Sequence, residues 1–308
     1  MHDSRLNNGW IYREQVNPSD AGLTVLDYYS QKYPHSTPCQ WFERITSGQV
    51  LLDGHSCNPH TRLITGQKLA YHRPPWEEPS APLNFDLLYS DSDVLVVAKP
   101  AGLPILPGGG FVEHTLLGQL KQHYPEDTPF PIHRLGRGTS GLVLLARSSF
   151  ARGFLSEQMR SRQISKIYRA LIPKSDLTDH FTINQPIGKI PHPVLGYIFG
   201  ATPNGKDALS ECRVLKRTSE TTLVEVKILT GRPHQIRIHL AAIGYPLIGD
   251  PLYTMGGIPK IQTPITPEKL PVPGDCGYYL HAYQLTFNLP HRESPLTVTC
   301  PPPRELEY

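Results

Sequence analysis

Short apolar runs alternate with turn residues over the first quarter of the chain. The spacing of the apolar residues in 24–29 predicts a helix after a Pro-Ser-Asp turn, and the run at 41–45 predicts a second helix. Residues 48–54 and 65–71 each place an apolar run beside a glycine, which is typical of a strand next to a turn. We therefore expect a compact unit over residues 17–75.

The segments on either side of this unit are polar or rich in proline. Residues 1–16 are polar and irregular, and we expect them to form a loosely attached arm. Residues 73–82 contain four prolines. Because proline lacks a backbone donor and interrupts both helix interiors and central strands, this segment is predicted to be a linker. We expect the second domain to begin near Phe85 and to extend over residues 85–308.

The second domain mixes strand and helix patterns. Short apolar runs bounded by turn residues predict strands, and apolar residues three and four apart predict helices. This mixture predicts an α+β fold with a mostly antiparallel sheet. Residues 254–277 are rich in Pro, Gly and Thr and predict a long surface loop. The expected strands lie at 87–89, 94–98, 142–146 and 222–228, and the expected helices at 114–120 and 153–163.

Composition narrows the class of protein. The 308 residues are 39% hydrophobic and 19% charged, which fits a soluble globular protein. No apolar run approaches the roughly 18–20 residues that cross a bilayer, and the first ten residues lack the apolar core of a signal peptide. The five cysteines form no Cys-x-x-Cys pair, and the fourteen histidines form no His-Glu-x-x-His pair. We expect a cytoplasmic protein with no membrane partner, no disulfide framework and no metal.

The charge is concentrated rather than large. The net charge is only +3, but the span from Arg134 to Lys174 holds nine basic residues and a single acid, Glu157. A local basic surface is what the neutralisation of RNA phosphates requires. The alternative is a solvated helix face within 153–163 whose charges bind nothing.

Six sequence blocks resemble one enzyme family. Residues 133–141 read His-Arg-Leu-Gly-Arg-Gly-Thr-Ser-Gly and resemble the signature of the RluA-type RNA pseudouridine synthases, which carry a catalytic Asp at the position of Gly136. The other blocks follow in family order at 96–104, 163–170, 205–208, 230–240 and 249–253. The resemblance covers roughly residues 85–308. It implies a pseudouridine synthase domain that isomerises uridine in a structured RNA, of ribosomal or tRNA-like type, without a cofactor.

The resemblance also implies roles for individual residues. Tyr168 matches the family tyrosine that lies over the flipped uracil, and Arg237 matches the arginine that pairs with the catalytic Asp. A tyrosine ring suits this place because it can stack on a base while its hydroxyl handles a proton. The candidate RNA-binding residues are Arg134, Arg137, Arg160, Lys166, Arg232, His234 and Gln235.

Gly136 cannot supply the carboxylate, and two outcomes are compatible with that departure. In the first, another acid reaches the site. Asp207 is the first candidate because it lies in a family motif near the pocket, and Asp250 is the second, although it is better suited to capping the turn that contains it. In the second outcome, the protein binds RNA without isomerising it. We favour an active isomerase, because a pure binder has no need for Tyr168 and Arg237 at one base.

The order of elements in 17–75 resembles that of the S4 RNA-binding domain. Helix, helix, strand, turn and strand follow one another as in that domain, which implies RNA contact. The unit has few basic residues, so a small cap that touches no RNA is the alternative. For the whole chain, a protein-interaction module with no RNA partner is a third and more remote function. The sequence leaves open the RNA, the modified uridine and the oligomeric state.

Overall fold

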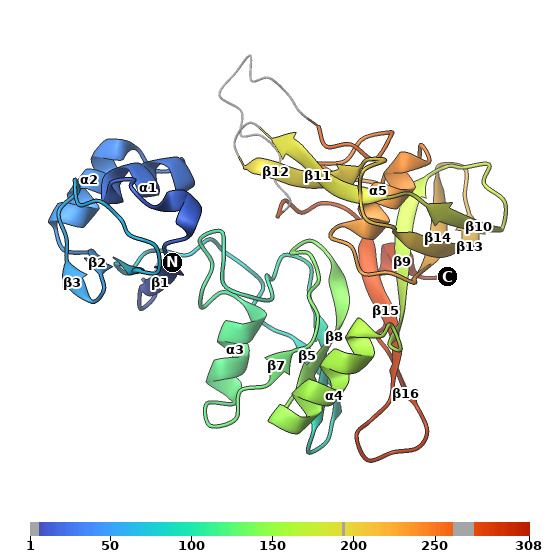
Figure 1. Ribbon diagram of the computed structural model, residues 1–308. Helices are drawn as coiled ribbons and strands as arrows, with labels where there is room; N and C mark the ends of the chain where they lie inside the picture. The colour runs from blue at the N-terminus through green and yellow to red at the C-terminus, as the bar shows by residue number, and fades with distance from the viewer. Residues whose placement is uncertain (1–5, 193–194, 261–273) are drawn as a thin grey trace, which may run out of the picture. The chain divides into compact units, whose positions relative to one another are not determined.

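Figure 1 presents a computed structural model, which describes residues 6–192, 195–260 and 274–308. The chain divides into two compact units, Met1–Glu78 and Pro79–Tyr308. The division falls inside the proline-rich segment 73–82. No helix among the described residues is both long and apolar enough to cross a membrane.

The first unit packs two short helices against a four-stranded antiparallel sheet in the order β1-β4-β2-β3. Its core is aromatic: the rings of Tyr29 and Trp41 stack with their centroids 4.6 Å apart. The elements are β1 Trp10–Gln15, η1 Pro18–Asp20, α1 Val25–Lys32, α2 Pro38–Thr46, β2 Val50–Leu52, β3 His55–Ser56 and β4 Lys68–Arg73.

Side chains fix where both helices of this unit begin. Thr24 accepts a hydrogen bond from the backbone N–H of Asp27 and so caps α1. Thr37 accepts from the backbone N–H of Gln40, whose side chain accepts from the backbone N–H of Thr37 in return, which makes a capping box at α2. These short polar signals agree with the helices predicted near 24–29 and 41–45.

The expectation of a loose arm over 1–16 is wrong for residues 10–15. They form β1, which pairs with β4 along its whole length. The ring of Tyr12 stacks on that of Tyr71 across the two strands, with the centroids 5.9 Å apart. Its partner residues, Lys68–Arg73, are far away along the sequence, and a local apolar pattern cannot reveal such a pairing.

The second unit is built on one large sheet, and the expected α+β class with a mainly antiparallel sheet is confirmed. Among the described residues, neighbouring strands follow the order β10-β13-β14-β9-β15-β8-β6-β5, with β16 beside β15 and β7 beside β8. Every pair is antiparallel except β8 with β15. The strands are β5 Asp86–Ser90, β6 Val94–Lys99, β7 Phe130–Pro131, β8 Ser140–Ala146, β9 Ser165–Pro173, β10 His180–Asn184, β13 Leu209–Arg217, β14 Thr221–Ile228, β15 Leu280–Phe287 and β16 Leu296–Thr299.

Helices cover both faces of the sheet where β6 and β8 lie. Alternate residues of these strands, such as Val96 and Val97, belong to different core clusters, as the two-residue period of a strand requires. Leu155 of α4 joins the first cluster and Leu116 of α3 joins the second. Figure 1 shows both helices beside this part of the sheet. The remaining elements are α3 Leu116–His123, α4 Ser149–Arg160, the hairpin β11 Ile187–His192 with β12 Gly196–Ala201, α5 Gln235–Ala242 and η2 Arg304–Leu306.

The single parallel contact explains part of the signature at 133–141. A Cβ atom on Gly141, whose φ is +104°, would lie 2.3 Å from the backbone oxygen of Ala282, so only glycine lets β8 approach β15 this closely. Beside it, the Ser140 hydroxyl lies 2.9 Å from Nδ1 of His281. Since Nε2 of His281 lies 3.1 Å from the Cys300 carbonyl and must donate to it, Nδ1 accepts from Ser140. These contacts hold the turn at residues 136–139, which lies directly before the first residue of β8.

The predicted long loop over 254–277 is only partly described. Residues 254–260 and 274–277 contain no helix or named strand, and residues 261–273 lie outside the described residues.

Candidate active site

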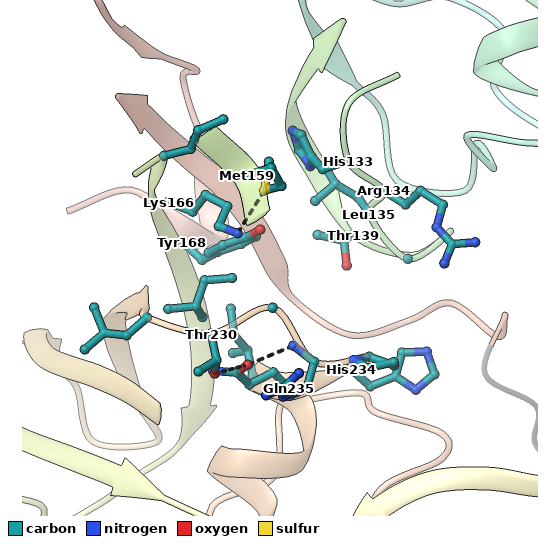
Figure 2. Close-up of a pocket in the computed structure, with 18 of the residues that line it drawn as sticks. His133, Arg134, Leu135, Thr139, Met159, Lys166, Tyr168, Thr230, His234 and Gln235 are labelled. Atoms are coloured by element: carbon teal, nitrogen blue, oxygen red, sulfur yellow. Dashed lines mark hydrogen bonds between the residues drawn. The ribbon is translucent and has the colours of Figure 1, made fainter. Parts of the chain in front are cut away.

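The second unit contains a cleft of about 920 Å³ beside the turn at residues 136–139. Its lining comes from four segments, which lie between residues 132 and 139, 159 and 168, 227 and 237, and 278 and 280. Figure 2 shows Tyr168 and Lys166 between the segment that contains His133 and Thr139 and the segment that contains Thr230 and Gln235. The cleft therefore gathers three of the sequence blocks into one place.

The lining of the cleft is strongly cationic. Among the described residues, seven arginines and lysines line it and no aspartate or glutamate does. Such a concave surface of one sign concentrates anions and attracts a phosphate backbone. The seven residues are Arg134, Arg160, Arg162, Lys166, Lys227, Arg232 and Arg237.

Tyr168 and Lys166 reach the cleft from β9. The Tyr168 side chain is largely buried, and burial raises the pKa of its hydroxyl, so the ring presents a neutral phenol. Lys166 lies two residues earlier on the strand and donates to the sulfur of Met159 at 3.5 Å. Burial lowers the pKa of Lys166, since its ammonium group has given up part of its hydration. A flat apolar ring beside a cation suits a base and its phosphate.

Arg237 already has an anion, and that anion is Asp250. Two hydrogen bonds of 2.7 Å join the guanidinium Nε and Nη2 to the two carboxylate oxygens. The side chains are only 2% and 1% exposed. Burial alone would raise the pKa of Asp250, but the hydrogen bonds and charge of Arg237 and the backbone N–H groups of Tyr253 and Leu252 hold it below its ordinary range. Asp250 is thus an ionised carboxylate that both caps its turn and fixes Arg237.

Gln235 holds the loop that precedes α5. Its Oε1 accepts from the Thr230 hydroxyl at 2.7 Å and from the Arg232 backbone N–H at 3.0 Å. Its Nε2 donates to the Leu209 carbonyl and to the Ser210 hydroxyl, both at 3.0 Å. All four hydrogen-bonding positions of the amide are therefore used inside the protein. Gln235 positions this loop of the cleft and has no donor left for RNA.

His234 presents a neutral ring at the start of α5. It adopts the left-handed backbone conformation with φ +55°, and its Nδ1 lies 2.7 Å from the Tyr253 hydroxyl. That hydroxyl donates its single hydrogen to the Phe199 carbonyl, so Nδ1 of His234 is the donor and Nε2 keeps a lone pair. Burial, aided by the charge of Arg237, lowers the pKa of His234 to about 4.

Tyr278 fills the space beside the signature turn. A Cβ atom on Gly136 would lie 2.9 Å from the Tyr278 hydroxyl, and one on Gly138 would lie 2.9 Å from a carbon of the ring. The hydroxyl shares a 3.2 Å hydrogen bond with Thr139, and the guanidinium carbon of Arg237 lies 4.2 Å from the ring centroid. Burial raises the pKa of Tyr278, while the charge of Arg237 opposes the rise. The Tyr278 hydroxyl crowds a side chain at Gly136, and the Tyr278 ring crowds one at Gly138.

The structure brings most of the candidate residues together. Tyr168, Arg237 and Gly136 all line the cleft, and so do six of the seven candidate RNA-binding residues. The exception is Arg137, whose Nε donates to the Gly274 carbonyl at 2.7 Å and which does not line the cleft. The six are Arg134, Arg160, Lys166, Arg232, His234 and Gln235.

The expectation that Asp207 reaches this site is wrong. Asp207 is exposed and does not line the cleft, and its backbone carbonyl accepts from Nε of Arg232. A motif places a residue near a site, but it does not fix the direction in which the side chain points. The acid beside Arg237 is instead Asp250, the second candidate.

Tyr278 is the site residue that the sequence patterns missed. It belongs to none of the six blocks and is far from Gly136 along the sequence. The signal in the sequence is the pair of glycines at 136 and 138, which implies a bulky neighbour without locating it.

The family model, the relatives and the solved structure that resemble this chain are all described as pseudouridine or pseudouridylate synthases. A family model described as RNA pseudouridylate synthase matches residues 93–242. The chain is 50% identical to an uncharacterized RNA pseudouridine synthase of Synechocystis, over 92% of this chain and 95% of that protein. It is 34% identical to ribosomal large subunit pseudouridine synthase D of Pseudomonas aeruginosa, over 79% of this chain and 78% of that one. The solved structure of human RNA pseudouridylate synthase domain containing 4 matches with a TM-score of 0.54 and 26% identity, over 71% of this chain and 89% of that chain.

Proposed function

Because the chain belongs to the RNA pseudouridine synthase family, we propose that it converts a uridine of a structured RNA into pseudouridine in the cleft described above. One observation carries this proposal beyond family membership: Tyr168 and the ion-paired Arg237 line the same cationic cleft. Ribosomal RNA is the first substrate to test, because the Pseudomonas relative is named for the large ribosomal subunit. A cytoplasmic location, where such RNA is available, belongs to the same proposal.

The cleft suits a uridine that has left its helix. Flipping a base out of a stack requires a few kcal/mol. Stacking on an aromatic ring returns about 1–3 kcal/mol per base, which makes Tyr168 the natural platform. Arg134 and Arg160, exposed at the cleft, can bind the flanking phosphates. The reaction breaks the N1–C1′ bond and makes a C5–C1′ bond, so it needs no metal and no redox cofactor.

A second function, RNA binding without isomerisation, is favoured by one observation. No carboxylate lines the cleft among the described residues, and Asp250, the acid bonded to Arg237, is buried in that pair. Loss of a catalytic group of this kind lowers rates by several powers of ten. The two functions differ in what happens to the hydrogen on C5 of the uridine.

Release of tritium separates the two functions. Large-subunit ribosomal RNA and tRNA transcripts made with [5-³H]uridine would be incubated with the full chain, and the tritium released to water would be counted. We expect release from at least one RNA, with pseudouridine detected in the same RNA. Binding of both RNAs without release from either contradicts the isomerase and leaves the binder.

A further inference from the structure

We propose that the Tyr278 hydroxyl is the oxygen that acts on the ribose of the flipped uridine, in the place left by the absent side chain of residue 136. This inference rests on the proposed isomerase function. Its basis is position: the hydroxyl lies 2.9 Å from where a Cβ atom of residue 136 would be, which is within the space that an aspartate carboxyl group would take. Tyr278 also lines the cleft.

Two neighbours of this hydroxyl favour its anion, although burial opposes it by raising the pKa of Tyr278. Arg237 lies over the ring, with 4.2 Å between the guanidinium carbon and the ring centroid. Thr139 shares a hydrogen bond with the oxygen. A cation and a hydroxyl are both groups that stabilise a phenolate. Arg237 therefore lies over the ring that carries this oxygen, even though Asp250 is its ion-pair partner.

The other hydroxyls of the described lining are less suited to this step. The Thr230 hydroxyl is committed to Gln235, and that of Thr139 to Tyr278, while Ser165 is an alcohol like these two. Tyr168 is the stacking platform on β9. A phenol ionises with a pKa of about 10, far below that of an alcohol, so tyrosine is the hydroxyl most able to form an anion. Tyrosine is also the nucleophile at the anomeric carbon in some enzymes that cleave glycosidic bonds.

The step balances as a double displacement. The Tyr278 phenol first loses its proton to solvent. The phenolate oxygen then bonds to C1′ as the C1′–N1 bond breaks, and the electron pair of that bond moves to the uracil ring. After the ring rotates, C5 bonds to C1′ and the phenolate leaves. The proton on C5 passes to solvent while N1 takes up a proton from solvent, which restores the aromatic uracil, and the phenolate regains its own proton from solvent. The hydrogen lost from C5 is the one that the tritium assay counts.

The pH dependence of the rate follows from the first step. The ionisable groups that face Tyr278 are Arg237, Asp250, Tyr253 and Cys276. Arg237 stays a cation and Asp250 an anion above pH 5, because the pKa of the arginine is raised and that of the aspartate lowered by their pairing. Since burial raises the pKa of Tyr278, the phenolate is scarce at neutral pH. We expect the single-turnover rate to rise with pH through the alkaline range.

The first test compares Tyr278→Phe with Tyr279→Phe. Tyr279 is the adjacent residue, is 36% exposed and does not line the cleft. Tyr278→Phe keeps the ring against Gly138 and should lower tritium release on the order of 10³-fold or more, as loss of a nucleophile does. Tyr279→Phe should match wild type. RNA affinity should be unchanged in both variants, so the loss falls on the chemical step.

A second test asks whether the hydroxyl and a carboxylate at residue 136 replace one another. Gly136→Asp alone should be inactive, because its side chain meets the Tyr278 hydroxyl. Combined with Tyr278→Phe, the aspartate gains the vacated space, and release should recover above that of either single variant. A fluorinated tyrosine placed at 278 alone should move the alkaline rise of the rate to lower pH, because fluorine makes the phenol more acidic.

The outcomes separate the two proposals. Undiminished release by a folded Tyr278→Phe variant, or a rate that the fluorinated tyrosine does not shift in pH, overturns the role of Tyr278 and leaves the isomerase function in place. If Tyr278→Phe does not fold, the fluorinated protein, which keeps the whole ring, decides alone. No release by wild type from either RNA at any pH overturns the isomerase function and this inference with it.

Discussion

The pair of Arg237 and Asp250 is buried beside the cleft, and Asp250→Asn should show how much this pair contributes to stability. The asparagine can still accept from the backbone N–H groups of Leu252 and Tyr253, but it removes the carboxylate charge that pairs with the buried guanidinium of Arg237. Breaking one side of a buried pair costs about 3–5 kcal/mol. For a unit of this size, this corresponds to a melting temperature lower by roughly 6–20 °C.

The matched control is Asp179→Asn. Asp179 pairs with Arg217 at the same distance of 2.7 Å, but the two side chains are 74% and 40% exposed. An exposed pair contributes about 0–1 kcal/mol because water screens it. Calorimetry of the full chain would measure both variants against wild type. Equal shifts for Asp250→Asn and Asp179→Asn would refute the argument, because they would mean that burial does not set the strength of the pair.

The same pair predicts how stability changes with pH. The pKa of Asp250 is lower in the folded chain than its ordinary value of 3.8. Its contribution is therefore fully present above about pH 4, where the unfolded carboxylate is also ionised, and disappears as pH falls through the lower folded pKa. The difference in melting temperature between wild type and Asp250→Asn should shrink in strong acid. A difference that is constant from pH 7 to pH 3 and below would contradict an ionic origin.

Three further predictions concern RNA, the first unit and a buried lysine. RNA affinity should fall on the order of tenfold or more between low and physiological salt. Arg134→Ala should weaken RNA binding, whereas Arg213→Ala, on β13 outside the cleft, should not. Filter binding measures both effects, and an affinity that does not change with salt contradicts the role of the cationic cleft. Deleting residues 1–78 should leave a folded second unit by circular dichroism, with lower RNA affinity if the first unit is S4-like; unchanged affinity identifies a cap. Lys99→Met should lower stability by about 1–3 kcal/mol, because three carbonyls, of Pro100, Leu103 and Arg137, lose their donor. Burial lowers the pKa of Lys99 to about 7, below its value in the unfolded chain. Because the unfolded chain then binds more protons than the folded chain, wild type should gain stability over Lys99→Met as pH rises from 7 to 9. A gain in stability on lowering the pH would contradict this.

The sequence predicted well those features that depend on neighbouring residues. The helices α1 and α2 were predicted because apolar runs and neighbouring turn residues are local signals, and the capping threonines seen in the structure are local as well. The strand β1 was missed because the residues that pair with it, Lys68–Arg73, are far away along the sequence. The same distinction holds in the cleft. Tyr168 and Arg237 came from contiguous motifs, whereas the bond from Arg237 to Asp250 depends on how a helix and a later turn pack together.

Gly136 is the residue where local reading was least informative. In the sequence alone, Gly136 is the position at which the signature lacks its acid. Asp207 was the first candidate to replace that acid, because it lies in another family motif. The structure shows that the space is not empty, since Tyr278 occupies it and fits both Gly136 and Gly138 at 2.9 Å. Restoring an aspartate therefore requires a second change, at Tyr278, and a signature that lacks its acid is not by itself evidence that the site is idle.

A site that had merely lost its catalyst would be expected to keep an unpaired arginine or to fill with apolar side chains. This one does neither. Arg237 has an anionic partner in Asp250, and the space beside the turn holds a hydroxyl that is hydrogen-bonded to Thr139 and belongs to the ring over which the guanidinium lies. A phenylalanine would fill the same volume without a buried polar atom that must be satisfied. The retention of that oxygen, within a cleft that gathers seven cations and a stacking tyrosine, favours a working site over a decayed one.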